Sequence, residues 1–356
     1  MGVQEERTEA ALGNWGPRML ANGVDFSDFL RLQGSIAHWS DWCAAWSEVG
    51  AGHAERARAA EAAGEYASAG EHYLHASLRY HFGKFLFFHD PAQLRAASQE
   101  AVRNYQRGLA YYDWPGERIE IPFEGGAMPG ILRKPWHVAR PPVVLLIPGL
   151  DSVKEEMHQY GDDFLRRGMA VLAIDGPGQG EMEFSHALRH DYEVPVRAAI
   201  DAIEGRQDVD AQRVGLMGVS LGGYFAPRAA AYEPRVKATI AISGCFRVAP
   251  YFHGVPQLTR DAFVHRLQAG TEEKALEEVD AFDLTGVVQR IKSPLLVVHG
   301  RKDRLFPPES AEQMARGAGG PATLWMFEDG NHVCNNIPYK YRPAQADWMA
   351  RQLTRR

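Results

Sequence analysis

Cysteine is scarce in this sequence of 356 residues, which contains only Cys43, Cys245 and Cys334. They are far apart, odd in number and form no Cys-x-x-Cys pair, which excludes a small domain held together by disulfides. We expect three reduced thiols and therefore a cytoplasmic protein. The first seven residues are mostly polar and acidic and contain no apolar stretch, so we also expect no signal peptide.

Long apolar runs and dense basic blocks are missing as well. No stretch approaches the roughly 18 apolar residues that span a bilayer, so no membrane association is expected. The chain has 39 Lys and Arg against 45 Asp and Glu, a net charge of −6, and we expect no nucleic-acid partner. No His-Glu-x-x-His pattern is present, and no metal is expected. The remaining composition, 45% hydrophobic and 24% charged, is that of a globular protein.

Residues 1–114 are predicted to form an all-helical domain. The stretch from Ala54 to Ala76 is rich in Ala, Glu and Arg and contains no proline, which favours a helix. Another helix should begin after Asp90-Pro91, where an aspartate can cap and a proline fits the first turn. Three histidines, His72, His75 and His81, fall among aromatics here. They are interpreted first as ordinary structural histidines, with metal ligands or a substrate wall as the alternative.

Residues 115–356 show a different pattern, in which short apolar runs alternate with helical segments. Arg118–Phe123 and Gly130–Arg133 are predicted to be the two arms of an antiparallel pair. The runs typical of buried parallel strands are 143–147, 170–174, 214–219, 238–242, 295–299 and 323–327. This alternation predicts an α/β fold with a mostly parallel sheet. The interval 244–291 has no clear strand and is expected to be an excursion from the sheet.

A candidate nucleophile lies where one of these strands meets a helix. The sequence Gly218-Val219-Ser220-Leu221-Gly222 has the G-x-S-x-G pattern between a buried strand and a helical segment. A serine at such a sharp turn is lifted clear of the sheet, and the flanking glycines avoid a clash. Chance occurrence in a glycine-rich chain is the alternative, but this strand-to-helix context favours Ser220 as a nucleophile.

A serine nucleophile needs a base and an acid that orients the base. In the alternating fold these residues follow later strands in the order Ser, Asp or Glu, His. Asp303 follows the apolar run 295–299, and His332 follows the run 323–327. We therefore predict Ser220, Asp303 and His332 as a catalytic triad. Three competing residues fit less well. His253 lies in the excursion, His299 lies at the strand end itself, and Asp329 is too close to His332 in the same loop.

The developing oxyanion also needs donors. We expect one from the backbone N–H of Leu221, directly after the nucleophile. The second should come from the loop after the run 143–147, and Leu150 is assigned by its position, with Gly149 or Asp151 as alternatives. The loop 175–181 contains Gly-x-Gly but not the full G-x-G-x-x-G fingerprint, so no dinucleotide cofactor is expected.

The sequence resembles one branch of the α/β-hydrolases. The resemblance rests on segments 80–86 and 89–91 in the helical part, and on 148–156, 175–181 and 218–223 in the remainder. This branch comprises 2,6-dihydroxypseudooxynicotine hydrolases, fermentation-respiration-switch-like esterases and fungal polyketide-shortening hydrolases. The resemblance implies that the helical domain is a cap, that the protein is a homodimer without a cofactor, and that Ser220, Asp303 and His332 form the triad.

Several members of this branch cleave a carbon–carbon bond beside a ketone. The nicotine-pathway enzymes are expected to use a glutamate shortly after the sixth strand, but Cys245–Arg260 contains no carboxylate. It offers Arg247, Tyr251 and His253 instead. With His81, these three are the candidate substrate-binding residues.

Three functions are consistent with these motifs. The first is a serine-dependent hydrolase that cleaves a carbon–carbon bond in an aryl ketone or β-diketone. The second is a carboxylesterase that uses the same triad on small acyl esters. The third, a binding protein on an inactive hydrolase fold, is disfavoured because all three triad residues are present. The expected partner is a small molecule, an aromatic ketone or ester.

Overall fold

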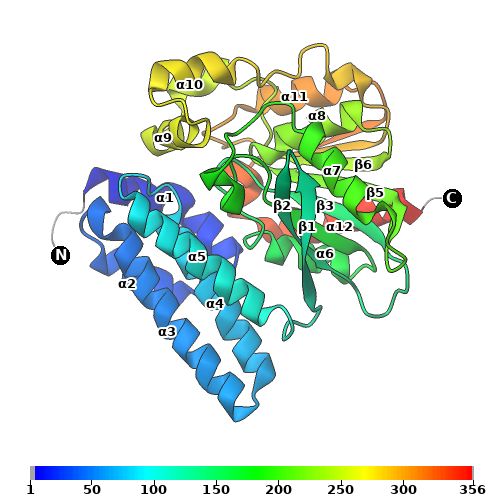
Figure 1. The fold of residues 1–356 in the computed structure, drawn as a ribbon. Helices are drawn as coiled ribbons and strands as arrows, with labels where there is room; N and C mark the ends of the chain where they lie inside the picture. The colour runs from blue at the N-terminus through cyan, green and yellow to red at the C-terminus, as the bar shows by residue number, and fades with distance from the viewer. Residues whose placement is uncertain (1–4, 355–356) are drawn as a thin grey trace. The chain divides into compact units, whose positions relative to one another are not determined.

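A computed structural model describes residues 5–354, and the chain divides into two compact units, Met1–Glu117 and Arg118–Arg356 (Figure 1). Part of the stretch on which the expectation about a signal peptide rests, residues 1–4, lies outside the described residues. Within residues 5–354, no helix combines the length and the apolar character needed to cross a bilayer.

The first unit consists of helices. Their bounds are α1 Glu6–Ala21, α2 Phe26–Ser35, α3 Trp42–Ala63, α4 Tyr66–Lys84 and α5 Pro91–Gly108. Asp90 caps α5 as the sequence predicts: its Oδ1 accepts hydrogen bonds from the backbone N–H groups of Ala92 and Gln93, both at 3.0 Å. Trp42 and Trp46 are fully buried in α3, and their rings lie 5.7 Å apart in a core of aromatics. The role of this unit as a cap stays a prediction.

The prediction of a helix over 54–76 is wrong in one respect, because this stretch forms two helices that are separated at Gly64. This residue adopts φ = +77° and ends α3, and α4 starts two residues later. A glycine in the left-handed region is a common helix terminator, because a side chain there would be strained. The two helices pack against each other as a hairpin.

The second unit is built on a sheet of eight strands in the order β1-β2-β4-β3-β5-β6-β7-β8. The β2–β4 pair is antiparallel, and the pairs from β4 to β8 are parallel. The strands are β1 Gly116–Phe123, β2 Gly126–Arg133, β3 Pro142–Ile147, β4 Ala170–Ile174, β5 Asp210–Val219, β6 Val236–Ile242, β7 Leu295–Gly300 and β8 Ala322–Phe327. This is the mostly parallel sheet of an α/β fold that the strand–helix alternation predicts.

Helices cover the sheet on both faces (Figure 1). α6 His158–Leu165 packs with α12 Pro338–Thr354, and α7 Glu193–Glu204 packs with α8 Gly222–Tyr232; α11 Pro308–Gly317 contacts β7 and β8. The helix α6 begins only at His158. The preceding residues form turns, because the backbone N–H of Lys154 donates to the side chain of Asp175.

The parallel strands end together at one edge of the sheet. Their register pairs Ile147 with Gly218, Val219 with Ile242, and Gly300 with Phe327. Loops that leave the carboxyl ends of neighbouring parallel strands therefore meet at this edge, which is where α/β folds build their sites.

The excursion 244–291 contains no strand of its own. Its helices are α9 Gln257–Arg266 and α10 Glu272–Val279, which pack against each other. A single bridge, from Arg247 to Asp283, holds its two ends side by side. The backbone N–H of Leu188 donates to the carbonyl of Arg266, which ties α9 to the loop after β4.

Candidate active site

Ser220 occupies the sharp turn between β5 and α8. Its φ of +56° lies in the left-handed region, which is costly for a residue with a side chain. The turn is held by two hydrogen bonds, from the N–H of Ser220 to the carbonyl of Ile242 at 2.8 Å, and from the N–H of Gly223 to the carbonyl of Ser220 at 2.7 Å. The strain is therefore fixed by the surrounding backbone.

The two glycines of the G-x-S-x-G pattern are required by close backbone contacts. A Cβ on Gly218 would lie 1.9 Å from the carbonyl oxygen of Gly222, and a Cβ on Gly222 would lie 2.3 Å from that of Ile147. Neither gap admits a carbon atom. A side chain at either position would clash with the backbone, as the sequence pattern predicts.

His332 lies within hydrogen-bonding distance of both other candidate triad residues. Its Nε2 is 2.8 Å from Oγ of Ser220, and its Nδ1 is 2.8 Å from Oδ2 of Asp303. A neutral imidazole that donates from Nδ1 to the carboxylate presents Nε2 as an acceptor for the serine hydroxyl proton. The three side chains come from loops after β5, β7 and β8.

The carboxyl group of Asp303 is fully buried, and hydrogen bonds stabilise its ionised form. Oδ1 accepts from the backbone N–H groups of Leu305 and Phe306 at 2.9 and 3.1 Å. Burial favours the neutral acid, but the charge and hydrogen bond of His332 outweigh it and lower the pKa of Asp303. The residue is therefore a carboxylate near neutral pH.

The competing residues have other partners. His299 is buried beside Asp303, its Nε2 lies 3.1 Å from the carbonyl of Phe306, and burial lowers its pKa, so it is a neutral donor. Asp329 is half-exposed and pairs with Lys340 at 2.5 Å. His253 is 73% exposed.

The loop that carries His332 is fixed by a residue that sequence reasoning missed. Ser243, directly after β6, has φ = +47°, and its Oγ accepts a hydrogen bond from the N–H of Val333 at 2.9 Å. Val333 and Cys334 also have positive φ, at 60° and 50°. In the sequence, Ser243 is distinguished only by its position directly after a predicted strand. That position does not indicate which group its side chain contacts.

The loop after β3 lies directly beside Ser220. A Cβ on Gly149 would be 3.1 Å from the Cβ of Ser220 and 3.6 Å from the backbone nitrogen of Leu221. Leu221 is the N-cap residue of α8, so its N–H belongs to the helix start that favours negative charge. Leu150 follows in the same loop and is buried. Both expected oxyanion donors thus belong to segments that adjoin Ser220, and their role stays a prediction.

The candidate substrate-binding residues lie in varied surroundings. Arg247 pairs with Asp283 at 2.9 Å and with Asp280 at 3.4 Å, within the excursion. Tyr251 is half-buried in the short 3₁₀ helix Ala249–Gly254. His81 is fully buried in α4 of the helical unit. Their roles, and that of the exposed His253, stay predictions.

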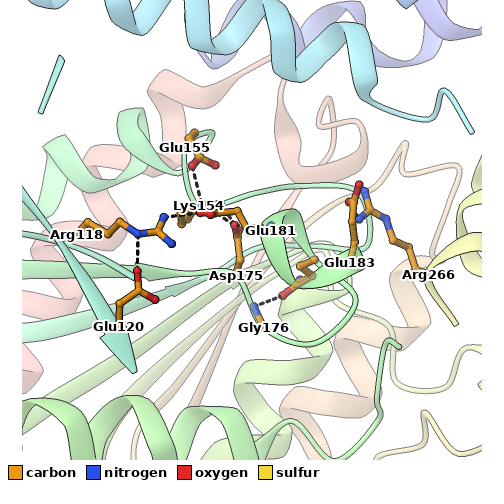
Figure 2. Close-up of polar contacts among 10 residues, drawn as sticks. Arg118, Glu120, Lys154, Glu155, Asp175, Gly176, Glu181, Glu183 and Arg266 are labelled. Carbon is orange, nitrogen blue, oxygen red and sulfur yellow. Dashed lines mark hydrogen bonds and ion pairs between the residues drawn. The ribbon is translucent and has the colours of Figure 1, made fainter. Parts of the chain in front are cut away.

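A buried charge cluster joins the loops after β3 and β4 (Figure 2). The ammonium of Lys154 lies 2.6 Å from Glu155, 2.7 Å from Asp175 and 2.7 Å from Glu181, and Glu181 also accepts from Arg118. Burial disfavours the ammonium charge, but the carboxylates outweigh this and raise the pKa of Lys154. Three carboxylate oxygens within 4.8 Å resemble a metal site, yet here they surround the lysine.

A second cluster of possible metal ligands lies in the helical unit. Nδ1 of His75 is 2.8 Å from Asp25, and Nε2 of His53 is 2.9 Å from Asp28. The guanidinium of Arg79 binds both carboxylates, at 2.5 and 2.8 Å. As in the first cluster, a side-chain cation already neutralises the acids, which favours the structural interpretation of these histidines.

Replacing Lys154 by methionine is expected to destabilise the protein by about 3–5 kcal/mol at neutral pH, because the buried carboxyl groups of Glu155 and Asp175 lose their counter-charge. Urea unfolding of Lys154→Met and wild type measures this difference. The loss should shrink as the pH falls towards 5. Without the ammonium, the pKa values of these carboxyl groups are higher in the folded state than in the unfolded chain. Protonation at lower pH then removes the uncompensated charge and restores part of the variant's stability.

The matched control is Lys237→Met, at an exposed lysine on β6. It should change the free energy of unfolding by less than about 0.5 kcal/mol. Equal effects of the two substitutions, or a loss at Lys154 that is independent of pH, would contradict the structural role of this cluster.

Known proteins with similar sequences and structures identify the family of this chain. The family described as "Esterase FrsA-like" matches residues 36–327. The chain belongs to this family. Similar proteins include "2,6-dihydropseudooxynicotine hydrolase" of Paenarthrobacter nicotinovorans, 31% identical over 350 residues, 98% of this chain and 94% of that protein. They also include alpha/beta hydrolase xenA of Xenoacremonium sinensis, 31% identical over 308 residues, 76% of this chain and 72% of that protein.

A solved structure supports the same conclusion. The crystal structure of the 2,6-dihydroxy-pseudo-oxynicotine hydrolase matches with a TM-score of 0.88 and 30% identity, over 96% of each chain. This FrsA-like protein is therefore a hydrolase with the α/β-hydrolase fold, as the sequence resemblance predicts.

Proposed function

We propose that Ser220, His332 and Asp303 form the catalytic triad of a serine-dependent hydrolase. The observation that carries this proposal is the pair of 2.8 Å contacts that His332 makes, one to the serine hydroxyl and one to the buried carboxylate. In such an arrangement the imidazole takes the hydroxyl proton during attack, and the carboxylate stabilises the imidazolium that forms. The N–H groups of Leu221 and Leu150 stabilise the tetrahedral oxyanion.

The reaction that we propose is hydrolysis of a carbon–carbon bond beside a ketone. The support is similarity along 98% of the chain to a relative named as a pseudooxynicotine hydrolase, together with the triad geometry. The substrate class is an aryl ketone with a ring hydroxyl next to the acyl group, or a β-diketone. Such a ring reacts as its keto tautomer, so the leaving carbon departs as an enolate rather than as an aryl anion.

Each step balances with water as the only co-substrate. Oγ of Ser220 forms a bond to the ketone carbon, and the hydroxyl proton moves to Nε2 of His332. Collapse of the tetrahedral intermediate breaks the bond to the ring carbon, which keeps the electron pair and takes the proton from His332. Water, activated by the same imidazole, then hydrolyses the acyl-enzyme to a carboxylic acid and restores the serine.

A matched pair of substrates tests the reaction. 2,4-Dihydroxybutyrophenone carries a butyryl group on carbon, and resorcinol monobutyrate carries the same group on oxygen. Both yield resorcinol and butyrate, so one chromatographic assay follows both. A carbon–carbon hydrolase is expected to release resorcinol from the ketone at a rate abolished in Ser220→Ala. If the enzyme hydrolyses the ester but cleaves neither this ketone nor any member of a panel of acylphenols and β-diketones, carbon–carbon cleavage is refuted. The proposed triad would stand in that case.

A carboxylesterase acting on small acyl esters is the second candidate. The observation that favours it is the family description, which names an esterase. The absence of a carboxylate between Cys245 and Arg260 points the same way, because protonation at carbon is slower than at oxygen and gains more from an acid in addition to His332. The ratio of kcat/KM for the two resorcinol substrates decides between the candidates.

We further propose a cytoplasmic homodimer. The three cysteines are buried and free, which suits a reducing compartment. Phe26 and Leu30, one helical turn apart on α2, are 64% and 47% exposed, and such a pair suits a protein contact. Light scattering on purified protein is expected to give about twice the chain mass of 39.6 kDa, and a monomer mass would refute the dimer.

A further inference from the structure

Gln179 is a fully buried amide that binds the loop beside the proposed nucleophile. It lies between β4 and α7, and its exposed fraction is zero. Its Nε2 donates to the carbonyl of Pro148 at 2.8 Å and to the carbonyl of Gly149 at 2.6 Å. One side chain therefore holds two consecutive carbonyls of the loop that carries the expected second oxyanion donor.

Holding these carbonyls also fixes the direction of the neighbouring N–H groups. In a trans peptide the C=O and the following N–H point in opposite directions. Because the carbonyls of Pro148 and Gly149 point to Gln179, the N–H groups of Gly149 and Leu150 point away from it. Gly149 also approaches Ser220 closely, since a Cβ built on it would lie 3.1 Å from the Cβ of Ser220.

The amide of Gln179 is itself held in one orientation. Its Oε1 accepts a hydrogen bond from the hydroxyl of Tyr192 at 2.5 Å and one from the N–H of Gly176 at 3.2 Å. A flipped amide would set its NH₂ against the N–H of Gly176 and its oxygen against the two carbonyls, and these three repulsive contacts fix the orientation. The ring of Tyr192 is buried and stacks on Phe225 with centroids 4.0 Å apart.

The segment that carries Gln179 is anchored on both sides by the buried charge cluster (Figure 2). Asp175 accepts from the N–H of Lys154 at 2.8 Å and from the N–H of Glu181 at 3.1 Å. A Cβ on Gly180 would lie 2.0 Å from a carboxylate oxygen of Asp175, so this position admits only glycine. The cluster ties the 175–181 segment to the end of the oxyanion loop, and Gln179 ties it to the start.

We propose that Gln179, oriented by Tyr192, is a positioning residue that aims the loop N–H at the oxyanion. The proposal rests on the proposed function, because it presupposes an oxyanion formed by attack of Ser220. Gln179 touches no reacting atom and acts through the backbone of Pro148–Leu150. Its contribution therefore arises only when negative charge develops on the substrate oxygen, and substrate binding does not need it.

Gln179→Glu and Gln179→Met test this role. Neither side chain can donate to the two carbonyls, while both keep the length of glutamine. With resorcinol monobutyrate or the matched ketone, whichever wild type turns over, kcat is expected to fall about 10²–10³-fold and KM to change less than threefold. The affinity for an aryl trifluoromethyl ketone, which forms an oxyanion with serine, should fall by the same factor as kcat/KM.

Tyr192→Phe removes only the donor that orients the amide, so a smaller loss of kcat is expected, about 3–10-fold. Gln212→Glu, on an exposed glutamine of β5, is the matched control and should keep wild-type kcat. Melting temperatures of all variants separate a loss of fold from a loss of rate.

Four outcomes decide the proposal. Wild-type kcat in a folded Gln179→Met or Gln179→Glu overturns it, as does a rise in KM with kcat unchanged. If both unfold, Tyr192→Phe decides, and wild-type inhibitor affinity in that variant overturns the proposal. Fluorophosphonate labelling of the wild-type enzyme tests the proposed function separately: failure to label Ser220 contradicts the triad and, with it, the role of Gln179.

Discussion

Replacing Ser220 by alanine is expected to lower kcat/KM about 10⁴–10⁶-fold for every substrate that the enzyme turns over. In the proposed mechanism this hydroxyl forms the acyl-enzyme, and without it His332 has no proton to take. Losses of this size follow removal of a serine nucleophile, and residual catalysis comes from the oxyanion donors and substrate binding alone. Steady-state kinetics with resorcinol monobutyrate measures the effect, and mass spectrometry should show no acyl-enzyme.

The fold should survive this change. Alanine relieves little of the strain at φ = +56°, because its Cβ remains, so the melting temperature should change by only a few degrees. Ser185→Ala, at an exposed serine in the same unit, is the matched control and should keep full activity. Activity of Ser220→Ala within tenfold of wild type would rule out a serine mechanism, for carbon–carbon and ester substrates alike.

The sheet could be predicted from the sequence because each buried parallel strand is a short apolar run bounded by turn residues. The runs 143–147 and 170–174 coincide with the body of β3 and of β4. The helical unit was less predictable. There the end of α3 depends on a single residue, Gly64, in a region of high helix propensity, and only the left-handed backbone shows the break.

The candidate triad could be predicted for a topological reason. Loops that follow neighbouring parallel strands meet at one edge, so three residues at strand ends are predicted to be close although 112 positions separate Ser220 from His332. The order of the strands and the G-x-S-x-G turn then leave few choices. The 2.8 Å distances themselves follow from the side-chain packing of the folded chain.

The supporting residues lacked any such signal. Ser243 accepts from a backbone N–H and Gln179 donates to backbone carbonyls, and every residue type offers such backbone groups, so neither contact can be inferred from the sequence of the partner segment. Lys154 and Asp175 lie in segments on which the family resemblance rests, yet their pairing across 21 positions appears only in the fold. Sequence reasoning thus identifies groups that need a particular chemistry, and it misses those that hold them in place.

Replacing Asp303 by asparagine is expected to lower kcat about 10⁴-fold while leaving the fold intact. The amide keeps the size of the carboxyl and one oxygen for the N–H groups of Leu305 and Phe306. Its NH₂ then faces Nδ1 of His332 and donates to it. The imidazole must carry its proton on Nε2, facing Ser220, and a protonated Nε2 cannot accept the hydroxyl proton.

The pH profile separates this cause from a simple loss of charge. The pKa of Asp303 is lowered, so in wild type its carboxylate stays ionised even below the pH at which an ordinary aspartate is protonated. Activity lost on mild acidification therefore reflects the protonation of another group. Asp303→Asn should therefore lose kcat by a similar factor between pH 6 and pH 9. Asp329→Asn is the control and should keep wild-type kcat, because Asp329, the second residue of the loop that carries His332, pairs with Lys340 instead. If Asp329→Asn instead abolishes activity and Asp303→Asn does not, the acid of the triad is misassigned, and the orientation of His332 in the working enzyme differs from that described above.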